Sequence, residues 1–174
     1  MRAEEKLGAL FIETSRERLG RHTAKLRQCV SLLPEEAVWN RTNKHVNSVG
    51  NLVLHLCGNV RQWIISGIGG AEDIRQRPQE FRQDVFLPKE ELLTMVDEIV
   101  QEADQVLAAF DVRRLGEVRV IQGYRVSCLE AIYSAIEHWS HHVGQIIHIT
   151  KATLDRDLAL THLTPEGYHP GTTA

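Results

Sequence analysis

The sequence contains no run of apolar residues close to the roughly 18 that a membrane-spanning helix requires. Its first residues, M-R-A-E-E-K, lack the apolar stretch of a secretory signal peptide. Its three cysteines are an odd number without CxxC spacing, which predicts buried, reduced thiols at Cys29, Cys57 and Cys128. The net charge is -3, so there is no positive excess of the kind that binds nucleic acid or anionic membranes. We therefore expect a cytoplasmic protein with no role on membranes or nucleic acids.

The sequence is otherwise that of an ordinary globular protein. Its 174 residues, of which 43% are hydrophobic and 25% charged, are enough for one domain, residues 1–174, with a sizeable core. The basic residues between positions 16 and 27 alternate with Glu13 and Glu17, which favours a solvated helix face over a phosphate-binding patch. The one compositional excess is histidine, with nine residues.

Helical spacing of apolar residues predicts four long helices, over residues 4–30, 47–66, 88–110 and 128–153. Asn47 and Ser48 suit a helix N-terminus because their side chains accept hydrogen bonds from unpaired backbone N–H groups. Pro88 suits another, with acidic residues following it. The pattern predicts an all-α four-helix bundle, in up-down-up-down order or in a crossover variant.

The connections between these helices carry further expectations. Trp39 is expected to anchor the stretch 37–46, and the linker 69–88 is long enough to suggest that it folds over the bundle. Four apolar linker residues are expected to pin it there, namely Phe81, Val85, Phe86 and Leu87. The β-branched stretch 117–127 around Gln122-Gly123 predicts a short β-hairpin between the third and fourth helices. The tail from about 154, with Pro165, Gly167 and Pro170, is expected to be irregular.

Two of the predicted helices carry a polar stripe without charged residues beside their apolar face. On the fourth helix this stripe contains His138 and His142, which are one turn apart, and Gln145. On the second helix it contains Ser48, Asn51, Leu52, His55, Asn59, Gln62 and Ser66. A solvent-exposed face would normally contain lysine and glutamate. The stripes therefore predict a partly buried polar region between two helices, where polar groups need partners.

A metal ion with its surrounding hydrogen bonds would provide such partners. Imidazole binds zinc, nickel, iron and copper, and two histidines at i and i+4 can chelate one ion. We therefore predict metal ligation by His55, His138 and His142, which would leave a coordination position open. The other reading of the histidine-rich stretch 137–145 is a wet helix face. His141 is expected to be exposed or to support a ligand.

The motifs N-S-V-G-N-L-V-L-H (47–55) and H-W-S-H-H-V-G-Q-I (138–146) resemble those of the DinB-like superfamily, also known through YfiT-type proteins. The resemblance covers nearly the whole chain. It implies a four-helix bundle with a divalent metal held at the positions of His55, His138 and His142. Relatives include thiol-dependent transferases and isomerases that use mycothiol or bacillithiol, and homodimers are frequent. The sequence is most similar to the uncharacterised branch, and its predicted hairpin is less typical of the thiol enzymes.

Two functions follow as expectations. The first is a metal-dependent transferase, or a hydrolase, in which the ion activates a small thiol or water while Asn59, Gln62 and Gln145 support the ligands or orient a small-molecule substrate. Zinc or nickel is the expected metal, with iron, manganese or copper as alternatives. The second is a non-catalytic module that binds metal or dimerises in a stress response. No acidic residue lies on either stripe, so the catalytic residues stay open.

Overall fold

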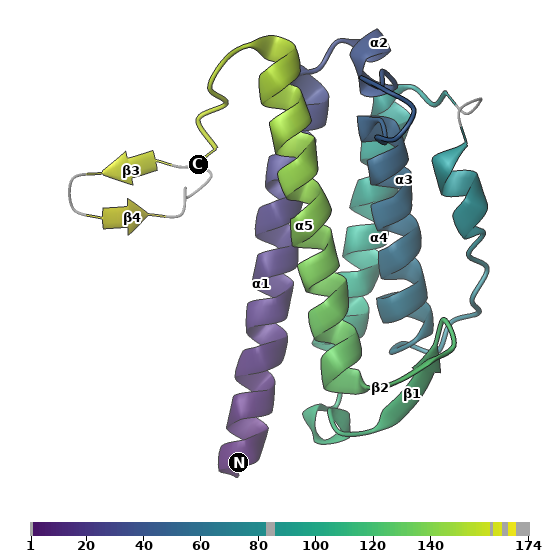
Figure 1. Cartoon of the computed structure of the whole chain (residues 1–174). Coiled ribbons are helices and arrows are strands. Elements are labelled where there is room, and N and C mark those ends of the chain that lie inside the picture. Colours follow the sequence, from purple (N-terminus) through teal and green to yellow (C-terminus); the bar gives the residue numbers. More distant parts are fainter. Residues whose placement is uncertain (1, 83–85, 161, 165–166, 170–174) are drawn as a thin grey trace.

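Four long helices form the bundle in the computed structural model, which describes residues 2–82, 86–160, 162–164 and 167–169. They are α1 (Ala3–Leu32), α3 (Val49–Val60), α4 (Lys89–Ala108) and α5 (Cys128–Leu154) (Figure 1). The π-helix η1 (Arg61–Ser66) continues α3 to the predicted end. These four segments match the predicted helices, so the all-α bundle is confirmed. None of the described helices is both long and apolar enough to cross a bilayer.

The helices follow the crossover order. In Figure 1, α1 and α5 run in one direction, and α3 and α4 run in the other. One ion pair agrees with this arrangement: Arg61 of η1 contacts Glu102 of α4 at 3.3 Å, and both residues lie in the second half of their helical segments, 49–66 and 89–108. Since α3 and α4 are parallel, the chain between them must return along the whole length of the bundle. Residues 67–82, with the short 3-10 helix η2 (Arg77–Phe81), make this return along the outside of α3, and residues 86–88 lead into α4.

Local chemistry explains where the helices begin. The Ser48 hydroxyl accepts a hydrogen bond from the backbone N–H of Asn51, as the predicted cap requires. Ser127 does the same for Glu130 at the start of α5. Pro88 precedes α4, and Glu90 follows in its first turn, where a negative charge favours the helix dipole.

The predicted hairpin is present and closes the lower end of the bundle in Figure 1. Strands β1 (Val118–Ile121) and β2 (Tyr124–Ser127) pair antiparallel. The turn residues Gln122 and Gly123 have φ of 54° and 84°, the left-handed region that a tight hairpin turn uses. Ile121 is buried and packs against Gly67, where an added Cβ would lie only 2.4 Å from its side chain.

The tail differs from the irregular structure expected of it. Strands β3 (His162–Thr164) and β4 (Gly167–His169) form a second antiparallel pair. The irregular tail was expected because of Pro165, which lies outside the described residues, and Gly167. Threonine and tyrosine favour strands, and Thr164 and Tyr168 lie in the two short strands.

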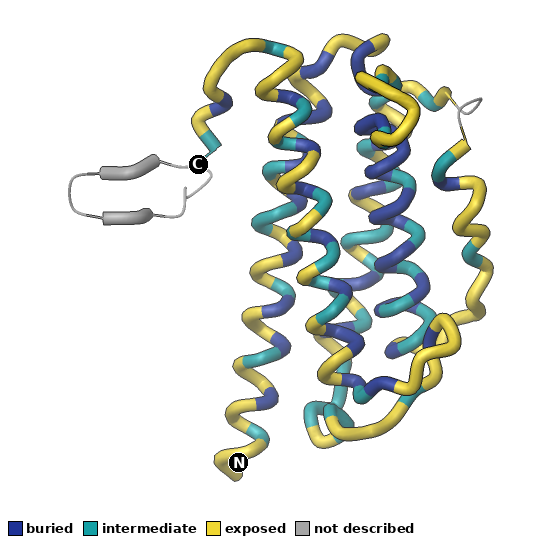
Figure 2. Tube along the Cα trace, in the orientation of Figure 1, coloured by how far each residue is buried: buried dark blue, intermediate teal, exposed yellow. Residues whose placement is uncertain are grey.

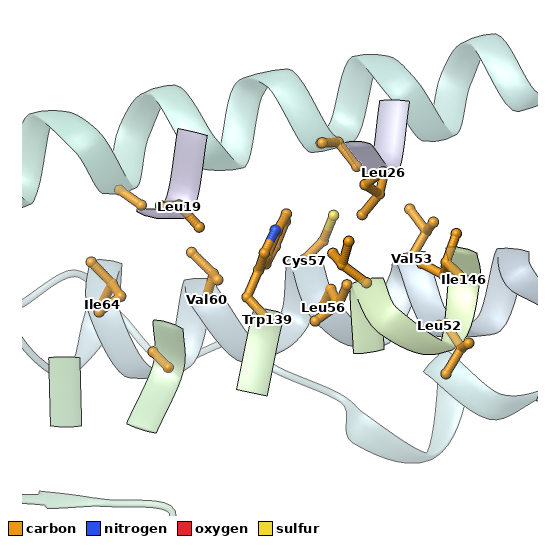
Figure 3. Close-up of a cluster of buried hydrophobic side chains, with 14 of the residues drawn as sticks. Leu19, Leu26, Leu52, Val53, Leu56, Cys57, Val60, Ile64, Trp139 and Ile146 are labelled. Atoms are coloured by element: carbon orange, nitrogen blue, oxygen red, sulfur yellow. The ribbon is translucent and has the colours of Figure 1, made fainter. Parts of the chain in front are cut away.

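The core lies between the four helices, whose inward faces are buried along their length (Figure 2). Trp139 of α5 is 0% exposed and packs in the middle of a cluster with aliphatic side chains from α1 and α3 (Figure 3). Cys29, Cys57 and Cys128 are all buried and free, as predicted. Burial raises the pKa of the Cys57 thiol to about 12, so this cysteine is an unreactive core residue.

Trp39 anchors the connection between α1 and α3, as predicted, and it also contacts the linker that leads to α4. It follows the short helix α2 (Glu35–Val38) and donates a hydrogen bond from Nε1 to the carbonyl oxygen of Leu87 at 3.0 Å. Its ring lies directly on Gly50 of α3, and the Phe86 ring meets it edge-on at 5.7 Å between centroids. The two linker residues beside Trp39 therefore hold the linker as predicted, whereas Val85 lies outside the described residues.

The close approach of Trp39 to α3 predicts the effect of a single methyl group. In Gly50→Ala, the new Cβ would lie 2.6 Å from the Trp39 ring, and a rigid indole cannot yield. Helix propensity favours alanine by about 1 kcal/mol, but overpacking costs about 1–3 kcal/mol, so urea unfolding should show a net loss of stability. The matched control is Gly20→Ala in α1, where nothing lies within 4 Å of the new Cβ. The control should gain stability, and a gain in both variants would contradict the packing argument.

Candidate metal centre

Three imidazole rings meet between α3 and α5. His55 projects from α3, and His138 and His142 project from adjacent turns of α5; one nitrogen of each lies within 4.8 Å of the others. The Nε2 atoms of His55 and His138 are 2.8 Å apart. In the part of the chain that the structure describes, no other three histidine, cysteine or acidic side chains gather in this way. The structure therefore brings together the three residues that the sequence nominated as ligands.

The geometry and the protonation of this cluster fit a divalent cation. Zinc–nitrogen bonds of about 2.0–2.1 Å place two ligands of a tetrahedral ion about 3.4 Å apart, which lies between the 2.8 Å contact and the 4.8 Å limit of the cluster. Burial, with the nearby His142 and His55 rings, lowers the pKa of His138 to about 4. Burial also lowers the pKa of His142. Both rings are therefore neutral at pH 7, which is the form that binds metals.

The outer nitrogen of His55 contacts a carboxylate that comes from the linker. His55 Nδ1 lies 2.8 Å from Oε2 of Glu80, a residue of η2. Arg75 grips the same carboxylate twice, from Nε to Oε1 at 2.7 Å and from Nη2 to Oε2 at 2.9 Å. Burial alone would raise the pKa of Glu80, but its hydrogen bonds with His55 and Arg75 outweigh burial and lower it. Glu80 is therefore a carboxylate at neutral pH.

The outer nitrogen of His142 has an acceptor as well. Gln145, one turn further along α5, places its Oε1 2.7 Å from Nδ1 of His142, so this nitrogen donates and Nε2 is left unprotonated. Gln145 thus contacts one histidine of the cluster, and its two expected roles, supporting a ligand or orienting a substrate, stay predictions. His141 is exposed and its Nε2 lies 3.4 Å from Nε2 of Gln145. His148 is also exposed.

The linker supplies most of the partners that the polar stripe of α3 requires. Asn51 donates from Nδ2 to the carbonyl oxygens of Glu80 and Arg82, both at 3.0 Å. Gln62 donates to Asp73 at 2.8 Å and accepts from Arg75 at 2.9 Å. Gln62 therefore holds the linker. Glu80 and Arg75 were not predicted from the sequence, because an irregular linker has no periodicity that indicates where its side chains point. The polar stripe without partners was the only signal of them.

A cavity of about 490 Å³ opens beside His55 and His138. Helices α3 and α5, η1, the linker and the hairpin all contribute to its walls, through His55, Asn59, Trp63, Arg75, Arg77, Gln122, Tyr124, Ser134, Ala135, Glu137 and His138. Asn59, one turn after His55, is only 9% exposed, and its Oδ1 has no hydrogen-bond partner among the described residues. Asn59 therefore contributes a buried, unpaired oxygen beside this cavity, and its two expected roles, supporting a ligand or orienting a substrate, stay predictions.

Comparisons with known proteins agree with this fold. A model of the family described as "Protein of unknown function (DUF1572)" matches residues 6–165. A solved structure of a conserved protein from Enterococcus faecalis is 16% identical, with a TM-score of 0.68 over 83% of this chain and 97% of that chain. A DinB-like protein from Bacillus cereus ATCC 10987 is 13% identical, with a TM-score of 0.65 over 84% of this chain and 94% of that chain. No curated protein matches the chain.

The lowered histidine pKa values predict how stability depends on pH in metal-free protein. Between pH 6.5, the ordinary histidine value, and about 4, the unfolded chain binds protons that folded His138 does not. The free energy of unfolding should therefore fall as the pH drops through this window, as measured by urea unfolding in the presence of a chelator. His138→Gln should flatten the dependence, and the exposed control His148→Gln should leave it as it is. An unchanged slope in His138→Gln would contradict the assignment.

Proposed function

Since the chain belongs to the DUF1572 family of unknown function, within the DinB-like superfamily, we propose that it is a metal-dependent transferase that joins a small thiol to an electrophilic substrate. The observation that supports this proposal best is a three-histidine cluster beside a cavity of about 490 Å³. A structural metal site is normally closed by four protein ligands, whereas three protein ligands leave a position open. The cluster provides three, and the cavity provides the space for a further molecule.

Histidines 55, 138 and 142 would hold the ion, with zinc or nickel the expected metals. When bound, a divalent cation supplies Lewis acidity, which lowers the pKa of a thiol or water and yields a nucleophile at neutral pH. Imidazole binds a metal as an uncharged ligand, so three of them would leave the double positive charge of the cation uncompensated. This favours an anionic fourth ligand such as a thiolate.

The residues of the cavity would position the two substrates. Asn59 offers an amide whose buried Oδ1 has no partner among the described residues, and Tyr124 and Arg77 lie at the exposed side. Glu80 is already bonded to His55 and Arg75, so it does not serve as a general base. In the transfer, the sulfur forms a bond to an electrophilic carbon of the substrate, and the leaving group departs with its bonding electron pair. The thiol proton passes to solvent.

The experiment pairs a mutation of a ligand with an exposed control on the same helix. Protein loaded with Zn²⁺ or Ni²⁺ receives bacillithiol or mycothiol and an activated aryl chloride, and thioether and chloride are measured. His142→Ala should lose bound metal by elemental analysis and reduce the rate to the uncatalysed level. His148→Ala should retain both metal and rate, because His148 is exposed and belongs to no ligand cluster.

Turnover that persists in His142→Ala would overturn the proposed function. Metal bound by wild-type protein without any transfer would instead support the alternative, a non-catalytic metal-binding module. The homodimer and the cytoplasmic location expected from the sequence stay predictions.

A further inference from the structure

We propose that Glu80 is a positioning residue that fixes the tautomer of His55 and so makes metal binding depend on the docked linker. This inference rests on the proposed metal site, and it adds a residue outside the ligand-bearing helices. Glu80 reaches His55 from η2, 25 positions further along the chain.

The contact between Nδ1 of His55 and Oε2 of Glu80 decides which ring nitrogen of His55 carries hydrogen. These atoms are 2.8 Å apart, and an ionised carboxylate can only accept a hydrogen bond. Nη2 of Arg75 also lies near Nδ1, but further away at 3.2 Å, so the shorter contact with the carboxylate decides that Nδ1 carries hydrogen. In a neutral imidazole this leaves the lone pair on Nε2. Nε2 is the nitrogen that faces His138. Glu80 thus leaves the metal-binding lone pair of His55 on Nε2, the nitrogen that faces the other histidines of the cluster.

Arg75 pairs with Glu80 and orients its carboxylate. The side chains of Arg75 and Glu80 are only 3% and 9% exposed, and a buried carboxylate requires a charged partner that hydrogen-bonds to it. The two hydrogen bonds from Arg75 provide that partner and fix the plane of the carboxylate. Arg75 also balances the charge, so that Glu80 orients His55 without adding a net negative charge beside the cation.

Several contacts with α3 fix the position of this part of the linker. Asn51 binds the carbonyl oxygens of Glu80 itself and of Arg82. The Phe81 ring lies against the His55 ring, at 4.9 Å between centroids. Gly58, one turn after His55 on the linker side, leaves the space that Glu80 occupies, because a Cβ there would lie 2.1 Å from Oε1. The linker is therefore packed so that the carboxylate reaches one ring nitrogen.

The competing explanation is a purely structural role, in which Glu80 and Arg75 only attach the linker to α3 by hydrogen bonds. The two explanations differ in Glu80→Gln. The side-chain oxygen of the glutamine would accept from Arg75, and its amide nitrogen would point to His55 Nδ1 and donate to it. That arrangement favours hydrogen on Nε2, which blocks the metal-binding lone pair. A purely structural role of Glu80 does not predict a change in the tautomer of His55.

The test measures the tautomer and the metal affinity separately. Nitrogen-15 NMR of metal-free protein should show His55 with hydrogen on Nδ1 in wild type and a shift toward hydrogen on Nε2 in Glu80→Gln. Titration with Zn²⁺ and with Co²⁺ should show Kd about 10–100-fold weaker in the variant, as is common when a partner of a ligating histidine is lost. Gly58→Ala, which displaces the Glu80 side chain without replacing any acidic residue or histidine, should change both quantities in the same direction.

The matched control loosens the linker elsewhere. Ser66→Ala removes the hydrogen bond to the carbonyl oxygen of Glu72 and touches neither Glu80 nor His55, so it should leave the tautomer and Kd unchanged. Circular dichroism checks that each variant is folded. Unchanged His55 shifts and Kd in Glu80→Gln would overturn the proposal, and so would an equal loss of affinity in Ser66→Ala. Wild-type protein that binds neither ion would overturn the proposed function as well.

Discussion

Buried polar side chains must find hydrogen-bond partners, and this requirement shapes the candidate site. The helix α3 and its continuation η1 carry Asn51, His55 and Gln62 on one buried stripe, all of them polar. The linker satisfies each of them, with backbone carbonyl groups for Asn51, a carboxylate for His55, and Asp73 and Arg75 for Gln62. Asn59 on the same stripe has no such partner for its oxygen and lines the cavity. The cavity therefore lies next to the part of the stripe for which the linker provides no hydrogen-bond partner.

This division gives His55 a different partner on each side. Its outer nitrogen faces Glu80 and its inner nitrogen faces His138. The two histidines of α5 are on consecutive turns, so the helix itself sets their spacing. His142 shows the same principle on a smaller scale, because Gln145 occupies its outer nitrogen. Nδ1 of His55 and Nδ1 of His142 thus each have a partner outside the cluster, and the three rings lie close to one another.

The topology of the bundle makes this arrangement possible. Parallel α3 and α4 require a connection that runs the length of the bundle (Figure 1). A short turn between antiparallel helices would leave the outer side of α3 facing water, and His55 would have no buried carboxylate. The long linker therefore has a chemical role as well as a connecting one. Its own fixed points are Trp39 at one end and the network around Arg75 at the other.

The amino-acid sequence by itself determined the helices, the hairpin turn and the ligand candidates, because all three depend on local spacing. The i,i+4 pair on α5 and the stripe on α3 follow from helical geometry, so His55, His138 and His142 could be nominated before any coordinates. Only the tertiary structure decided that α3 and α4 are parallel and that Glu80 and Arg75 lie on His55. No periodicity aims the side chains of an irregular linker. Their positions depend on contacts with residues distant in the sequence, and those contacts exist only once the bundle has folded.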